Sequence, residues 1–159
     1  MGWVHALSRG INRGIEIIVG VLAMAMALVT GLQVFFRYAL NHSLFWSEEV
    51  GRMLLVWITF LGATVAYRRK AHVGIDVAVR RLTPTAQRAL EQFVLGLSGV
   101  FFVVLIAYGL RFIRFIAYQK TAALGLPMGL PYTVIPLSGV VFLIHAVSLA
   151  LESEKPPGS

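Results

Sequence analysis

The chain has 159 residues, of which 58% are hydrophobic and 13% are charged, and its formal net charge is +7. This apolar fraction is too high for an ordinary water-soluble domain of this size, so the composition indicates an integral membrane protein. The apolar runs leave no room for a soluble catalytic domain, the absence of cysteine excludes disulfides and thiolate chemistry, and the cations lie between the runs instead of forming the continuous basic face typical of nucleic-acid binding.

The first expected element is a membrane span at residues 15–36, which follows a short basic leader at residues 1–14 and has Glu16 at its start. Small residues in the middle of this run imitate a signal-peptide cleavage site, but a true site would follow the run. The pattern therefore favours an uncleaved span. A polar connection at residues 37–45 is typical of a turn, so this span and the next are expected to form an antiparallel hairpin.

The second span, residues 46–67, carries Glu48, Glu49 and Arg52 inside its first two turns. Either carboxylate is three or four residues from Arg52 and can lie beside its guanidinium on one helical face. An unpaired cation at this depth would be costly. We interpret the three charges as a buried clamp that fixes this helix against another subunit, with a proton or ion relay as the alternative.

The most basic segment is the connection that follows, with six cations: Arg68, Arg69, Lys70, Arg80, Arg81 and Arg88. Basic residues interleaved with apolar ones predict a short interfacial helix at residues 73–82. His72 and Asp76 are four apart, so the carboxylate can hold the imidazole in an ordered surface turn. No second histidine stands at ligand spacing, and no metal site is expected.

Thr83 followed by Pro84 predicts the start of a third helix, because a capping hydroxyl precedes proline at the first helical position. Its apolar part is the third span, residues 90–112, and it is expected to continue through Arg111 and Arg114. Such a helix exceeds the thickness of a bilayer and must tilt or protrude.

Glycine and proline residues at 125, 127 and 129 predict a turn before the fourth span, residues 131–151. Pro136 is expected to kink this span, and His145 to form a hydrogen bond between helices. Residues 152–159 form a polar tail. The whole chain, 1–159, is thus expected to be one all-α membrane domain with four transmembrane helices.

The cations indicate the orientation of the chain in the membrane. Nine of them lie on the side that holds both termini and the central connection, and four lie on the opposite side, not counting Arg52. Loops rich in lysine and arginine stay in the cytoplasm, so both termini are expected there.

A substrate-binding transporter usually places charges or broken helices near the bilayer midplane. Here the charges lie within a few turns of a surface, so no catalytic residue, substrate site or cofactor is expected in this chain.

Two groups of residues resemble the small membrane subunit of tripartite ATP-independent periplasmic (TRAP) transporters, the DctQ type. The first is Phe45-Trp46-Ser47-Glu48-Glu49 with Arg52, Trp57, Phe60-Leu61-Gly62-Ala63, Arg69, His72 and Asp76. The second is Leu124-Gly125-Leu126-Pro127 with Tyr132, Ile135 and Pro136 at the start of the fourth span. The resemblance covers residues 11–151.

The resemblance implies a non-catalytic subunit in the bacterial inner membrane. It would support a large elevator-type subunit, in a stable heterodimer, during sodium-driven uptake of a small organic acid such as a dicarboxylate, a keto acid or sialic acid. A periplasmic binding protein would dock transiently, near residues 37–45 and 111–130, and phospholipids would surround the spans. Subunit contacts would involve Trp46, Glu48, Glu49, Arg52 and Trp57, while Arg69, His72 and Asp76 would order the central connection.

Two other functions fit four spans of this size. The chain could be a self-sufficient proton-coupled exporter that acts as a homodimer, with Glu16 as its proton carrier, although Glu16 lies within about a turn of the basic leader. It could also be a structural membrane protein or assembly factor unrelated to transport.

Overall fold

The computed structural model describes residues 2–69 and 83–153, and its regular elements in these ranges are helices. They are α1 (Gly2–Ala39), α2 (Phe45–Arg68), α4 (Pro84–Ile116), the short α5 (Gly129–Tyr132) and α6 (Val134–Ser153). Extended pairing in the same residues is limited to one β-bridge, between Lys120 and Pro127. Within the described residues, four stretches are long and apolar enough to cross a membrane, Ala6–Ala39, Phe45–Arg68, Thr85–Ile116 and Gly129–Leu151, which confirms the expected all-α membrane class.

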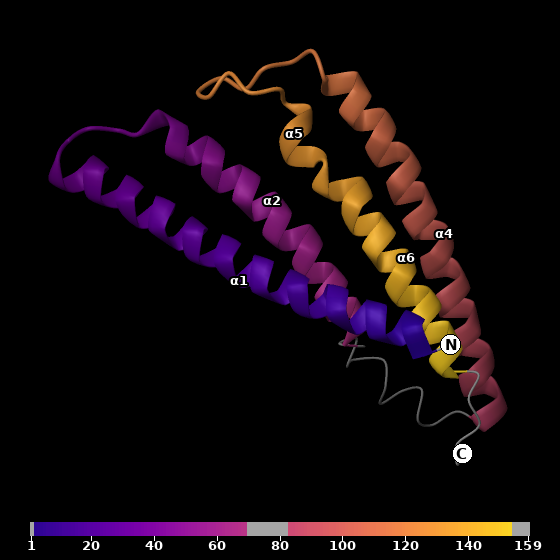
Figure 1. Ribbon diagram of the computed structural model, residues 1–159. Coiled ribbons are helices and arrows are strands. Elements are labelled where there is room, and N and C mark those ends of the chain that lie inside the picture. The colour runs from indigo at the N-terminus through magenta and orange to yellow at the C-terminus, as the bar shows by residue number, and fades with distance from the viewer. Residues whose placement is uncertain (1, 70–82, 154–159) are drawn as a thin grey trace.

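Helix α6 lies at the centre of the bundle (Figure 1). It packs on α4 and α2 and, less extensively, on α1, while α1 packs mainly along α2. Among the 18 most apolar consecutive residues of each span, 56% are buried in α5–α6, compared with 6–11% in the other three spans. Most of the apolar surface of α1, α2 and α4 therefore faces lipid or another protein.

Two helical pairs, α1 with α2 and α4 with α6, diverge along their length (Figure 1). At the terminal end, which holds the start of α1 and the ends of α2 and α6, the helices lie close together. At the loop end, which holds the turn at residues 40–44 and the hairpin at residues 117–128, α1 and α4 are far apart, and the hairpin extends towards the start of α2.

Helix α1 is longer than the first span predicted from the sequence, because residues 2–14 are helical and continuous with it. Leu7, Ile11 and Ile15 recur every four residues; Ile15 belongs to the apolar core cluster and Ile11 packs against it. At 1.5 Å per residue its 38 residues extend about 57 Å, well beyond the roughly 30 Å of a hydrocarbon core.

Helix α4 begins and ends as predicted. It starts at Pro84, where the Thr83 hydroxyl accepts a hydrogen bond from the Ala86 amide, and it continues past Arg111 and Arg114 to Ile116. Glycine allows α6 to approach it closely, since an added Cβ at Gly139 would lie 2.6 Å from Ile106 Cγ1.

The fourth span is interrupted at Thr133, between α5 and α6. Pro136 accounts for the break, because its ring nitrogen cannot donate to the Tyr132 carbonyl four residues earlier and its ring crowds that carbonyl. The Thr133 amide donates instead to Leu130, three residues back. The predicted interfacial helix at residues 73–82, with His72 and Asp76, lies outside the described residues.

Candidate functional site

At the loop end, Glu49 fixes the outer hairpin, residues 117–128, onto α2. The Glu49 side chain is only 6% exposed, and its Oε2 accepts hydrogen bonds from the backbone amides of Ala123, at 2.7 Å, and Leu124, at 3.3 Å. The Thr121 hydroxyl also interacts with this carboxylate. Oε1 has no hydrogen-bond partner at the distance of a well-formed bond within the described residues. The charge of this buried carboxylate is thus stabilised by hydrogen bonds from backbone amides.

The outer hairpin presents these donors because its own backbone is tightly turned. Thr121 N donates to Leu126 O, Gly125 N donates to Thr121 O, and the Thr121 hydroxyl accepts from Leu126 N. Gly125 has φ +66°, a conformation that costs glycine little and other residues more. The sequence indicated a turn here, but not that Glu49 would organise it.

The other two charges at the start of α2 are exposed, and neither pairs with the other. Glu48 Oε1 lies 3.4 Å from Gln33 Nε2 of α1. Arg52 acts on the Glu49 carboxylate electrostatically, but forms no ion pair with an acidic residue in the described parts of the chain. The contacts expected inside the three-charge clamp are therefore not formed within this chain.

The two tryptophans of α2 have different surroundings. Trp46 is 40% exposed at the first turn of the helix. Trp57 is partly buried and packs against the core cluster formed by Ile15, Leu61, Val134 and Val141. Trp57 is thus an internal packing residue in this chain, while Trp46 has surface available to lipid or a partner.

The three residues expected at the start of the fourth span form its connection to α4. Pro127 pairs with Lys120 at the base of the outer hairpin. The Tyr132 ring meets the Phe112 ring edge to face, with centroids 5.3 Å apart. Pro136 is buried against α4, where a Cβ at Gly109 would lie 3.1 Å from its Cδ.

At the terminal end, Arg69 pairs with a residue that the sequence did not connect to it. Its guanidinium lies 2.8 Å from Glu16 Oε1, and the Asn12 amide donates to the same oxygen at 2.6 Å. The Arg69 side chain is 64% exposed and that of Glu16 is 33% exposed. This pair joins the end of α2 to α1.

His145 forms the expected hydrogen bond between helices. Its Nδ1 lies 2.8 Å from the Ser8 hydroxyl of α1, and both residues are fully buried. Ser8 was missed because its partner lies 137 residues away, although its position three residues before Ile11 and seven before Ile15, on the same face of α1, is a weak signal. Nearby, the rings of Tyr67, Phe102 and Phe142 join α2, α4 and α6.

These arrangements join helices. Among the described residues, no cluster of three histidine, cysteine, aspartate or glutamate side chains is close enough to hold a metal ion. The polar contacts concentrate at the two ends of the bundle, and the packing between the ends is apolar.

Comparisons with known proteins identify a family and several relatives. Residues 26–155 match the family described as "Tripartite ATP-independent periplasmic transporters, DctQ component". A protein of Haemophilus influenzae named as a TRAP transporter small permease is 32% identical over 87% of this chain and 86% of its own length. The ectoine TRAP transporter small permease protein TeaB of Halomonas elongata is 30% identical over 82% of this chain and 71% of its own length.

A third relative, the C4-dicarboxylate TRAP transporter small permease protein DctQ of Rhodobacter capsulatus, is 29% identical over 82% of this chain and 56% of its own length. The match covers the start of α2, the outer hairpin and α6, so it includes the groups of residues on which the resemblance rested. The chain belongs to the DctQ family and is a small permease subunit of a TRAP transporter.

Proposed function

We propose that this chain is the non-catalytic brace of a sodium-driven TRAP importer, bound stably to a large elevator-type membrane subunit that holds the substrate and sodium sites. The observation that supports this role best is how the charged and polar side chains are used. Glu49 binds backbone amides, Glu16 binds Arg69, and His145 binds Ser8, so each of them ties one part of the bundle to another.

Two longer relatives support the choice of partner. The chain matches 22% of the sialic acid TRAP transporter permease protein SiaT of Haemophilus influenzae and 15% of the isethionate TRAP transporter permease protein DctMQ of Oleidesulfovibrio alaskensis. In both, a segment similar to this chain is part of a permease several times longer. In the present case we expect the remaining permease to be a separate chain that binds α1 and α2.

The substrate is expected to be a small organic acid captured by a periplasmic binding protein. Relatives named for C4-dicarboxylate, sialic acid and ectoine differ in substrate but share this subunit, which agrees with a substrate site outside it. The outer hairpin and the turn at residues 40–44 would face the periplasm and meet the binding protein. Both termini would lie in the cytoplasm of a bacterial inner membrane, as the distribution of cations indicates.

The test is purification in mild detergent followed by native mass analysis. A complex of this chain with a large polytopic membrane protein at a ratio near one to one supports the proposal, as does loss of substrate uptake when the chain is deleted. A stable homodimer without such a companion contradicts it. Because the chain has no cysteine, single cysteines at Ser43 and Ser153 report on orientation: only the first should react with an impermeant reagent added outside.

A further inference from the structure

The exposed face of α2 differs from a surface made for lipid. Between residues 52 and 66 its exposed residues are Arg52, Leu55, Thr59, Ala63 and Ala66, which recur every three or four positions and form one stripe. Thr59 and Ala63 each stand two residues from the buried Leu61, about 200° around the helix from it. Leu55 is the one large apolar side chain in this stripe. Small and hydroxylated residues on a membrane helix are typical of a contact with another helix.

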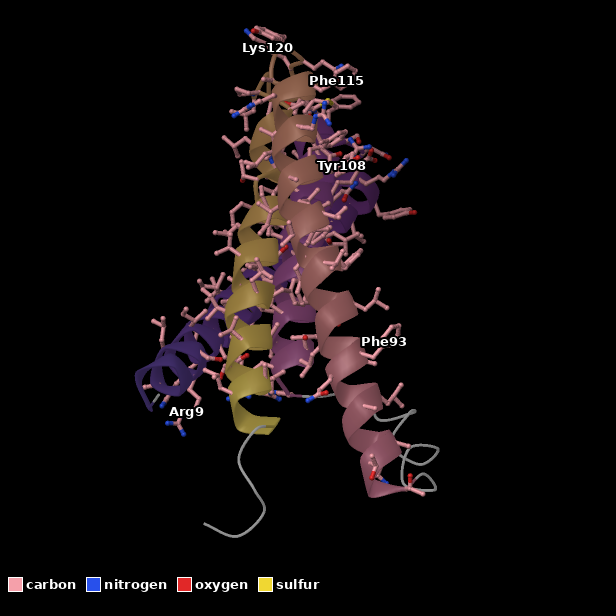
Figure 2. The ribbon with its side chains drawn as sticks, turned by 90° about the vertical axis from the view of Figure 1, so that its right-hand side faces the viewer. Arg9, Phe93, Tyr108, Phe115 and Lys120 are labelled. Carbon is pink, nitrogen blue, oxygen red and sulfur yellow. The ribbon has the colours of Figure 1, made fainter. Side chains whose placement is uncertain are left out.

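Helix α4 shows the opposite composition on its exposed face. Phe93, Tyr108 and Phe115 project from it away from the bundle in Figure 2, and they are 66%, 64% and 78% exposed. Most of the exposed positions between them also carry large apolar side chains: Val94, Leu97, Val100, Phe101, Val103, Val104, Leu110 and Phe112. This face is suited to hydrocarbon.

Helix α1 has a shallow hollow on the same side of the α1–α2 pair as the α2 stripe. The hollow is lined by Ala23, Met26, Ala27, Thr30, Gly31 and Val34. Glu16 precedes Ala23 by two helical turns and so lies on this side of α1, and it pairs with Arg69, which follows Ala66 by three residues along the stripe. The hollow and the stripe are therefore two halves of one face, which we call the α1–α2 face.

Arg52 gives this face a charge. It is exposed seven residues into α2, about 10 Å along the axis from Phe45, and no carboxylate in the described residues forms an ion pair with it. The Glu49 carboxylate is directed to the outer hairpin, and Glu48 lies beside Gln33. A cation within a span is costly unless an anionic group reaches it.

We propose that the α1–α2 face receives a transmembrane helix of the large permease subunit, which inserts beside the hollow and presents a carboxylate to Arg52. The inference rests on the proposed function and specifies the surface through which this chain would bind the large subunit. A second copy of this chain fits less well. A two-fold axis along the membrane normal would place two Arg52 side chains at the same depth and bring like charges together.

Photocrosslinking in native membranes tests the choice of face. p-Benzoylphenylalanine is placed in turn at Thr59 on the stripe, at Ala27 in the hollow and, as the control, at Val104 on the lipid-suited face of α4, which is 44% exposed. Adducts with the large subunit are expected from Thr59 and Ala27 and not from Val104. Adducts with a second copy of this chain would overturn the inference.

The outcomes separate this inference from the proposed function. If the large subunit co-purifies with the wild-type chain but crosslinks from Val104 and not from Thr59 or Ala27, the face is wrong and the proposed function stands. If no large subunit co-purifies at all, the proposed function fails as well.

Charge substitutions test the role of Arg52. Arg52→Gln should lower the amount of large subunit that co-purifies by about threefold to twentyfold, the range expected for one polar contact between membrane helices. Arg52→Lys should retain most of the complex, because it keeps the charge. Arg111→Gln, on the exposed side of α4, should have no effect. An unchanged yield with Arg52→Gln, or an equal loss with Arg111→Gln, would overturn the proposed pairing.

Discussion

Gly139 is the position at which the packing of α4 against α6 is tested most directly. A Cβ added there would lie 2.6 Å from Ile106 Cγ1 and 3.4 Å from the Phe102 carbonyl oxygen. Carbon atoms pack best at about 3.5–4.0 Å, so one helix must move by roughly 1 Å or Ile106 must leave its rotamer. We expect this overpacking in Gly139→Ala to cost about 1–3 kcal/mol.

The matched control is Gly96→Ala, since Gly96 is exposed on α4 and an added Cβ would meet nothing within 4 Å. Alanine in a helix is favoured over glycine by about 0.5–1 kcal/mol, and this gain applies to both variants. The difference between their free energies of unfolding therefore isolates the steric cost. It is measured by titrating mixed micelles with SDS and following helix content.

A double variant identifies the clashing side chain. Ile106→Ala removes both Cγ1 and Cδ1, so Gly139→Ala combined with it should be less damaging than the sum of the two single changes, by about 1–3 kcal/mol. If Gly139→Ala stabilises the chain as much as Gly96→Ala does, the close approach of α4 and α6 is refuted. Additive effects in the double variant would instead show that the clash is not with Ile106.

Three further predictions concern the polar contacts. Glu49→Gln should speed hydrogen exchange at the Ala123 and Leu124 amides, because a neutral acceptor replaces the carboxylate that binds them. Glu48→Gln is the control and should leave both exchange rates unchanged. Equal exchange rates in the two variants would contradict this assignment. Ser8→Ala should destabilise the bundle by about 1–3 kcal/mol in the same SDS titration, because it leaves the buried His145 Nδ1 without its hydrogen-bond partner. An unchanged midpoint of unfolding would count against that bond. Glu16→Gln should leave most of the uptake activity in cells, because the pair with Arg69 is partly exposed; complete loss of transport would favour the proton-coupled exporter.

The helices could be predicted because their signals are local. Thr83 and Pro84 define the start of α4 within two residues, and the length and apolarity of each run identify it as a span. The helical continuity of residues 2–14 with the first span is harder to predict, because Arg9 and Arg13 give this segment the composition of a basic leader. The stripe of Leu7, Ile11 and Ile15, which continues the helix, is equally visible in the sequence.

The contacts that hold the bundle together could not be predicted in the same way. The Glu49 carboxylate binds an amide 74 residues away, and Ser8 meets His145 across 137 residues. Spacing within one helix suggested that Arg52 would pair with Glu48 or Glu49, but a competing set of backbone donors in the outer hairpin binds Glu49. Local geometry permits an ion pair; which donor reaches the carboxylate is decided by tertiary structure.

The distribution of contacts also bears on how a brace would work. At the terminal end, the Ser8–His145 bond, the Glu16–Arg69 pair and three aromatic rings connect α1, α2, α4 and α6. At the loop end, Glu49 links the first helical pair to the outer hairpin, while α1 and α4 diverge (Figure 1). Elements with fewer contacts open at lower free energy. Relative motion of the two helical pairs should therefore be greatest at the loop end, where the outer hairpin can follow a docking protein while the terminal end stays packed.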